Sequence, residues 1–417
     1  MRCRSRSRTT AHCSSRRSSR SRPAALAMPP LRRAGEAACF IEPTTLRSLT
    51  MRLRFSALVS LTALVAAVMG ATLPHIACAA TPAANTTGAA SAPLRLIGST
   101  ALPDYKGDFD HFAADVTGGR LFLAGEDGAT LEVFDLGSGR HLRTVKGFDQ
   151  PHAILYLPDL NRLIVTDSGA GMTRIVDGAS YRIIGSIPLT AGADSMRYDP
   201  SRRHLYIVTG GKNAEPKMTR TIVSEVDPRT SSHIGDVTFE TDFTEAMAVE
   251  QHGHRLFVNV TGKSTLAVVD KATRQVMANW PIHGAELNAP MAFDEAHQRL
   301  FVGTRKPFKL LVLDAANGNT IASFDAPQRT NEVIFDEQNQ RIYVAGDDYL
   351  GVIQQKDRDH YEEIARVPTA KGAKTAILVP ARNCLYVAVS PGDAGTGGKL
   401  MRFDVLPTSG AKALASR

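Results

Sequence analysis

Apolar and polar residues recur in one short pattern along this chain. A polar or basic residue precedes alternating aliphatic, aromatic and β-branched residues, and small residues follow, as in RLFLAG from Arg120 and RLFVGT from Arg299. Consecutive copies are 42 to 51 residues apart, and a period of this length indicates an array of supersecondary units. The first aliphatic residue of each copy, called the marker below, is Leu121, Leu163, Leu205, Leu256, Leu300, Ile342 or Leu385.

Each period has room for four short strands. In the copy around Leu300, apolar runs at 291–293, 300–302, 310–313 and 321–324 are separated by polar turns rich in Asp, Asn and Gly. Runs of this kind predict antiparallel strands. A four-stranded sheet cannot cover both of its faces alone, whereas sheets stacked radially cover each other. The sequence therefore predicts an all-β fold, a seven-bladed β-propeller with four antiparallel strands per blade.

The two ends of the repeat region predict how the ring closes. The last copy ends with its third strand, 400–405, and has no fourth. The first apolar run, 94–100, belongs to no copy, and its sequence RLIGST resembles the fourth strand RIIGSI from Arg182. We expect this N-terminal strand to complete the last blade and to remove an open sheet edge.

The segments outside 94–406 have no core pattern. Residues 1–50 are rich in Arg and Ser, and we expect an upstream extension that is not part of the native protein or a disordered leader. Residues 51–80 have the charged, apolar and small-residue regions of a secretory signal peptide, which predicts a periplasmic or secreted protein without a membrane span after cleavage. Residues 81–93 are expected to be a flexible tether, and 407–417 a disordered tail.

Charge and cysteine content change once the leader is set aside. Residues 1–80 hold 13 Arg and two acids, which leaves 36 basic and 39 acidic residues in 81–417, a net charge of −3. This balance disfavours nucleic acid as a partner. Four of the five cysteines precede residue 81, so Cys384 has no partner for an internal disulfide. We expect a monomer stabilised by packed blades.

The strand phrases 163–166 (LIVT), 205–209 (LYIVT) and 386–388 (YVA), with Asp and a Gly-containing turn after the third strand, resemble the YVTN repeat. That family consists of exported seven-bladed propellers of the YncE-like type. The resemblance covers about residues 94–406 and implies the fold. It does not imply one activity, because related propellers include lactonases as well as pure binding proteins.

Candidate chemistry gathers where each innermost strand is expected to begin, at the mouth of the central channel. The residue eleven places before the marker is polar in six of seven copies, and the residue two places later is apolar in all seven. This change predicts a polar ring made of Asp110, His152, Asp194, Glu245, Ala289, Asn331 and Lys374. Asp108 and His111 enlarge the ring in the first copy.

Two interpretations of this ring remain open. Asp110, His152, Asp194 and Glu245 lie on four neighbouring blades, and carboxylates with one imidazole suit a divalent cation such as Ca²⁺, Mg²⁺ or Zn²⁺. Alternatively, polar residues border the mouth only because water fills it. The long loops 210–218 and 390–398 are expected on the same face, where ligand specificity is commonly located.

The sequence therefore favours an exported binding or scaffold module. Its channel mouth and loops would bind a small molecule, a component of the cell envelope or a protein. One alternative is a metal-assisted hydrolase of lactonase or lyase type that uses the acidic residues and His152. A second alternative is a module that binds single-stranded nucleic acid, which the net charge of −3 disfavours.

Overall fold

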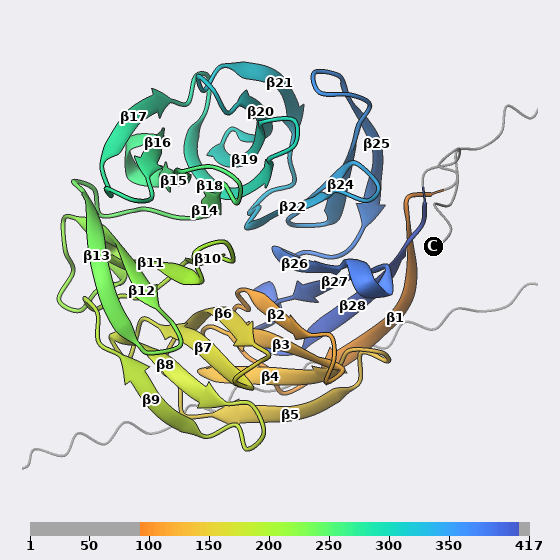
Figure 1. Ribbon diagram of the computed structural model, residues 1–417. Helices are drawn as coiled ribbons and strands as arrows, with labels where there is room; N and C mark the ends of the chain where they lie inside the picture. The colour runs from red at the N-terminus through yellow and green to blue at the C-terminus, as the bar shows by residue number, and fades with distance from the viewer. Residues whose placement is uncertain (1–91, 408–417) are drawn as a thin grey trace, which may run out of the picture. The chain divides into compact units, whose positions relative to one another are not determined.

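The computed structural model describes residues 92–407, and within this range the chain is built almost entirely of strands. Seven four-stranded antiparallel sheets surround a central axis like the blades of a propeller (Figure 1). The prediction of a seven-bladed β-propeller is confirmed. The leader and signal segment expected before residue 81 lie outside the described residues, as do nearly all of the expected tether and tail.

Each blade contributes one strand to each of four concentric layers. The innermost strands are β2 (Phe112–Asp115), β6 (Pro151–Leu157), β10 (Met196–Asp199), β14 (Met247–Val249), β18 (Glu286–Asp294), β22 (Glu332–Asp336) and β26 (Thr375–Val379). The second strands are β3 (Arg120–Gly125), β7 (Arg162–Asp167), β11 (His204–Gly210), β15 (Arg255–Val260), β19 (Arg299–Lys306), β23 (Arg341–Ala345) and β27 (Cys384–Val389).

The third strands are largely buried, whereas the outermost strands carry most of the exposed residues of each blade. The third strands are β4 (Thr130–Asp135), β8 (Met172–Asp177), β12 (Thr221–Asp227), β16 (Thr265–Asp270), β20 (Phe308–Asp314), β24 (Tyr349–Gln355) and β28 (Gly398–Val405). The outermost strands are β5 (His141–Lys146), β9 (Ile183–Ile187), β13 (Ser232–Phe239), β17 (Val276–Pro281), β21 (Thr320–Asp325), β25 (Tyr361–Pro368) and β1 (Leu94–Leu102).

Short 3-10 turns are the only helical elements among residues 92–407. They are η1 (Gly211–Asn213), η2 (Thr261–Lys263), η3 (Pro380–Arg382) and η4 (Gly392–Ala394). The turns η1 and η4 lie in the two long loops, 210–218 and 390–398, which connect second and third strands. Within the described range, no helix has the length and apolar character that a membrane crossing requires.

The core lies between neighbouring blades. All seven markers are buried, with 0 to 1% of their surface exposed, because each sits in the second strand of its blade. Between the third and fourth blades, for example, Tyr206 and Val208 pack against Met247 and Leu256. Each sheet therefore buries its faces against the next, which explains why one period of the sequence cannot fold alone.

The ring closes as the two ends of the repeat region predicted. Strand β1 pairs antiparallel with β28 from Leu94 opposite Val405 to Leu102 opposite Gly398, with an irregularity between Leu96 and Gly98. Figure 1 shows this N-terminal strand in orange beside the blue C-terminal strand. The first and last described strands thus complete one blade.

The hairpins have local causes. The carboxylate of Asp135 accepts a hydrogen bond of 2.7 Å from the backbone nitrogen of Ser138, and Asp177 does the same for Ser180 at 2.8 Å. Such Asp-containing turns satisfy backbone groups where a third strand ends.

Candidate functional site

Eleven polar side chains converge on one cavity of about 160 Å³ at the channel mouth. Most of the ring that the sequence predicted is among them, since loops from outermost strands enter the innermost strands here. The predicted residues that line the cavity are Asp110, His111, His152, Asp194, Glu245, Asn331 and Lys374. The remaining lining residues, which sequence reasoning missed, are Glu126, Lys212, Asn213 and Arg305.

The ring members do not all contribute in the same way. Ala289, the apolar member, is buried and accepts a hydrogen bond of 2.9 Å from the side chain of Asn259. Asp108 lies beside the cavity rather than on it, and its carboxylate forms ion pairs of 3.1 Å with Lys374 and 2.6 Å with Arg329. Asp108 therefore holds two cationic side chains, Lys374 and Arg329, at the rim.

His152 is the centre of the hydrogen-bond network. Its Nδ1 atom lies 2.9 Å from Oδ2 of Asp110, and its Nε2 atom lies 2.8 Å from the hydroxyl of Ser168. Ser168 donates its single hydroxyl proton to the side-chain oxygen of Gln150 at 3.1 Å. Nε2 must therefore donate to Ser168, and Nδ1 faces only carboxylates, so both ring nitrogens carry protons. The geometry describes an imidazolium.

The electrostatics of His152 agree with this protonation state. Burial by itself would lower its pKa, but the carboxylates of Asp194 and Asp110 outweigh burial and raise the pKa to about 9. Burial would likewise raise the pKa of Asp110, yet the charges of His111 and His152 hold it well below the usual range. Asp110 is therefore an ionised carboxylate at neutral pH.

His111 forms a second ion pair deeper in the channel. Its Nδ1 atom lies 3.0 Å from Oε2 of Glu332, and its Nε2 atom lies 3.6 Å from Oδ1 of Asp110. Burial opposes the protonation of His111, but the two carboxylates raise its pKa to about 10. Both histidines at the mouth are thus cations at neutral pH.

The far side of the mouth joins Glu245 to Asp110 through two residues. Arg305 lies 3.4 Å from Glu245 and donates a hydrogen bond of 2.5 Å to the side-chain oxygen of Asn331. Asn331 in turn donates to Asp110 at 2.9 Å. Burial and the neighbouring carboxylate of Asp194 raise the pKa of Glu245. Cationic side chains are therefore interleaved with the acidic ones around the mouth.

Glu126 and Lys212 complete the lining. Lys374 lies 3.4 Å from Glu126, while burial and the nearby Asp110 carboxylate raise the pKa of Glu126 to about 7. Lys212 lies in η1, 3.2 Å from the centre of the Phe243 ring, and burial lowers its pKa. The lining contains five cationic and four acidic side chains, and the raised pKa values of Glu126 and Glu245 favour protonation of these two acids. The cavity therefore does not carry a negative net charge at neutral pH.

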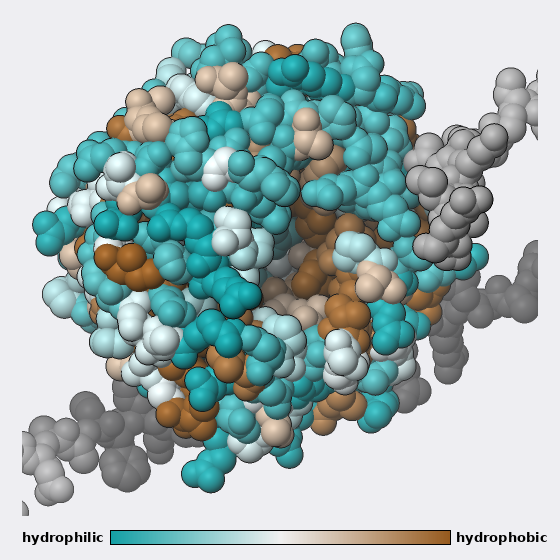
Figure 2. Space-filling view, viewed as in Figure 1, coloured by the Kyte–Doolittle hydropathy of each residue, from teal (hydrophilic) through white to brown (hydrophobic). Residues whose placement is uncertain are grey.

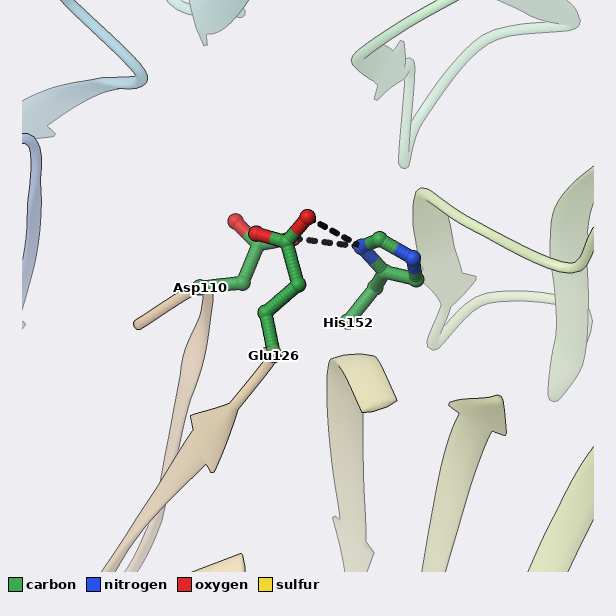
Figure 3. Close-up of side chains that lie close together, drawn as sticks. All are labelled: Asp110, Glu126 and His152. Atoms are coloured by element: carbon green, nitrogen blue, oxygen red, sulfur yellow. Dashed lines mark hydrogen bonds and ion pairs between the residues drawn. The ribbon is translucent and has the colours of Figure 1, made fainter. Parts of the chain in front are cut away.

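One part of this lining has the donor atoms of a metal site. Ligand atoms of Asp110, Glu126 and His152 lie within 4.8 Å of one another. Figure 3 shows both carboxylates directed at the Nδ1 atom of His152. This group shares Asp110 and His152 with the predicted metal set but contains Glu126 instead of Asp194 and Glu245. A divalent cation would have to displace the proton between His152 and Asp110.

Two of the four missed lining residues, Glu126 and Arg305, share a second register along the sequence. Five places after the marker, the seven copies carry Glu126, Ser168, Gly210, Thr261, Arg305, Asp347 and Ser390. These positions end the second strands, which run antiparallel to the innermost strands, so they reach the same face of the ring. A second alignment at this offset would have found Glu126, Ser168 and Arg305. Lys212 lies in the longer third-blade loop and breaks the register.

Comparison with known proteins supports the fold but neither a family nor an activity. No family model matches the sequence, and no curated protein was found to match it. Hydrazine synthase of Kuenenia stuttgartiensis has a similar structure, with a TM-score of 0.58 and 15% sequence identity over 68% of this chain and 92% of that chain. At this identity the similarity concerns the propeller alone, and the resemblance to the YVTN-repeat family stays a prediction.

Proposed function

We propose that this chain is an exported β-propeller binding module of the YVTN-repeat type, which binds a small solute carrying an anionic group at its channel mouth. The convergence of polar residues from all seven blades on one cavity supports this function. Its volume of about 160 Å³ lies below the range of roughly 300–1,000 Å³ that is usual for drug-sized ligands, so the solute must be small.

The charges of the mouth support the choice of ligand. Asp110 and Asp194 have partners within the network, Asn331 and Asn213 among them, at 2.9 Å and 2.7 Å. The ammonium of Lys212 makes no hydrogen bond or ion pair within residues 92–407 and lies over the Phe243 ring. The guanidinium of Arg305 contacts Glu245 at 3.4 Å and donates to the side chain of Asn331 and the backbone oxygen of Thr330. Lys212 is available to an incoming carboxylate, and the nearby charge of Arg305 favours the same anion, while the acids can accept hydrogen bonds from an amino or hydroxyl group. A small zwitterion or hydroxy acid matches both demands.

A thermal-shift screen tests the proposal, because a ligand of the folded state raises the melting temperature by mass action. The panel consists of amino acids, hydroxy acids, simple sugars and lactones. We expect amino acids or hydroxy acids to raise the melting temperature, and Lys212→Met with Arg305→Met to abolish the shift. Arg140→Met, an exposed hairpin residue, is the matched control. If the double variant responds like the unchanged protein, the mouth is not the binding site.

A metal-assisted hydrolase is the second candidate function, favoured by the group Asp110, Glu126 and His152. A divalent cation held there would act as a Lewis acid towards an ester or lactone carbonyl. The chain's own residues would hold it, while Lys374 would orient the polar end of the substrate. Metal analysis of the purified protein distinguishes the two functions. Stoichiometric metal that Glu126→Gln removes would favour the hydrolase.

The proposal that the protein is exported rests on the sequence of residues 51–80. The expected signal peptide would bring the chain to the periplasm or outside the cell, where a propeller without disulfides is stabilised by its blades. Sequencing the N-terminus of the protein from the exported fraction tests this. A mature N-terminus near residue 81 is expected, and protein that keeps residues 51–80 would contradict export.

A further inference from the structure

Below the mouth, the central channel widens into two adjoining cavities. The middle cavity, of about 580 Å³, meets the mouth at His111. The lower cavity, of about 990 Å³, continues from it towards the opposite face. The two share Arg197, Met291, Glu332 and Ile334 among their walls. The space-filling view shows a hollow at the centre of the ring with hydrophobic side chains on its wall (Figure 2).

Arg197 is a cationic residue in the wall of the middle cavity, which combines apolar side chains with polar ones such as His111, Gln251 and Glu332. It lies eight places before the marker Leu205, in the innermost strand β10. The corresponding residues of all seven blades are Ala113, Leu155, Arg197, Ala248, Ala292, Ile334 and Ile377. One arginine thus enters the channel at a level where every other blade has an aliphatic residue.

The guanidinium of Arg197 has no partner among residues 92–407. It makes no hydrogen bond and no ion pair within 4.0 Å, although its side chain is exposed to the channel interior. The acid that acts on it electrostatically is Glu332, whose carboxylate is already bound to His111 at 3.0 Å. Protein surrounds the channel at this depth, and this burial lowers the pKa of Arg197.

A guanidinium that faces an enclosed channel and contacts no carboxylate can still bind an anion, and the surrounding protein screens that attraction less than bulk water does. Arginine presents two parallel N–H groups that match a carboxylate. The neighbouring side chains, Met196, Met247, Met291 and Leu155, offer only apolar contact. A ligand that satisfies both parts of this cavity has a carboxylate at one end and an apolar chain or ring at the other.

We propose that the middle of the channel is a second binding site, in which Arg197 binds the carboxylate of a small amphipathic organic acid whose apolar part lies against the methionine side chains. This site goes beyond the proposed function, because it shares only His111 with the mouth cavity. The volume of about 580 Å³ lies within the usual range for small-molecule sites.

Calorimetric titration with hexanoate, hexanol, hexylamine and inorganic phosphate tests the assignment. The first three probes have the same chain length and differ in the polar group. We expect hexanoate to bind and the amine not to bind. Hexanol should be weaker by roughly 10- to 100-fold, which is the usual value of charge-assisted hydrogen bonds. Equal binding of hexanoate and hexanol would overturn the role of Arg197, and phosphate binding as tightly as hexanoate would overturn an organic acid as the ligand.

Two variants complete the test. Arg197→Met should fold normally, since it replaces an unpaired charge with a side chain like its neighbours, and should weaken hexanoate binding roughly 10- to 100-fold without affecting hexanol. Arg140→Met should bind like the unchanged protein. Lys212→Met with Arg305→Met should keep hexanoate binding, even if the proposed function of the mouth is wrong. Loss of hexanoate binding in this mouth variant, with retention in Arg197→Met, would place the site at the mouth and overturn the inference.

Discussion

Asn331 donates a hydrogen bond of 2.9 Å from its side-chain nitrogen to Oδ1 of Asp110, although the two residues are 221 positions apart in the chain. They occupy the same register in the sixth and first blades. Oδ2 of the same carboxylate is bound by His152 of the second blade. Asp110 is therefore held from two sides of the mouth, and its position depends on the closed ring.

Replacing Asn331 tests how much this bridge contributes. Asn331→Leu removes a donor from a buried carboxylate, and we expect a loss of about 1–3 kcal/mol in the free energy of unfolding. Asn279→Leu is the matched control, because Asn279 lies exposed on the outermost strand β17 and should change stability by less than about 0.5 kcal/mol. Urea unfolding of both variants measures the difference. Equal values would show that the bridge does not stabilise the ring.

Closure of the ring by β1 is tested by two leucines of the same strand. Leu94 is 4% exposed and packs into the core between the last two blades, whereas Leu96 is 52% exposed. Leu94→Ala should lower the free energy of unfolding by about 2–5 kcal/mol, and Leu96→Ala by no more than about 0.5 kcal/mol. Thermal or urea unfolding measures both. If Leu94→Ala were as stable as Leu96→Ala, the packing of β1 would not be what secures the ring.

The fold could be predicted from the sequence because every blade repeats the same pattern of apolar residues that must be buried. The markers, the four strands of each period and the strand borrowed at closure all follow from that repetition. The mouth ring was predictable for the same reason, since one offset from the marker places seven residues on one rim. Blade-specific features were not predictable in this way. Lys212 enters the mouth from an irregular loop, and the bonds from His152 to Ser168 and from Arg305 to Asn331 depend on side-chain geometry.

Stability should depend on pH through the two histidines of the mouth. The pKa of His152 is raised to about 9 and that of His111 to about 10, above the ordinary value of about 6.5. A basic group whose pKa is higher in the folded than in the unfolded protein stabilises the folded state as long as it is protonated. This contribution is complete below about pH 6.5 and disappears as the pH rises through about 9 to 10. The melting temperature should therefore fall between pH 7 and pH 10.

His152→Gln isolates one part of that dependence. Glutamine keeps a polar side chain but does not titrate, so the fall in melting temperature should become shallower. His283→Gln is the control, because His283 is exposed and does not line the mouth cavity. A pH profile of His152→Gln that matched the unchanged protein would mean that His152 does not carry the expected charge.

The buried ion pair between Lys271 and Asp199 joins the third and fourth blades and provides the last test. The ammonium of Lys271 lies 2.9 Å from Oδ2 of Asp199, and their side chains are 4% and 0% exposed. Lys271→Met leaves a buried carboxylate without its cation and should cost about 3–5 kcal/mol. The pair Arg229–Asp159 is a suitable comparison, because its side chains are 37% and 52% exposed.

Arg229→Met should change the free energy of unfolding far less than Lys271→Met does, since exposed ion pairs are screened by water. Adding Asp199→Asn to Lys271→Met should recover part of the lost stability, because the amide carries no charge and can still accept hydrogen bonds from the Ser201 backbone. Urea unfolding of the single and double variants measures this coupling. Were Lys271→Met as mild as Arg229→Met, the buried ion pair would contribute no more to stability than an exposed one, and the apolar core would hold the two blades together.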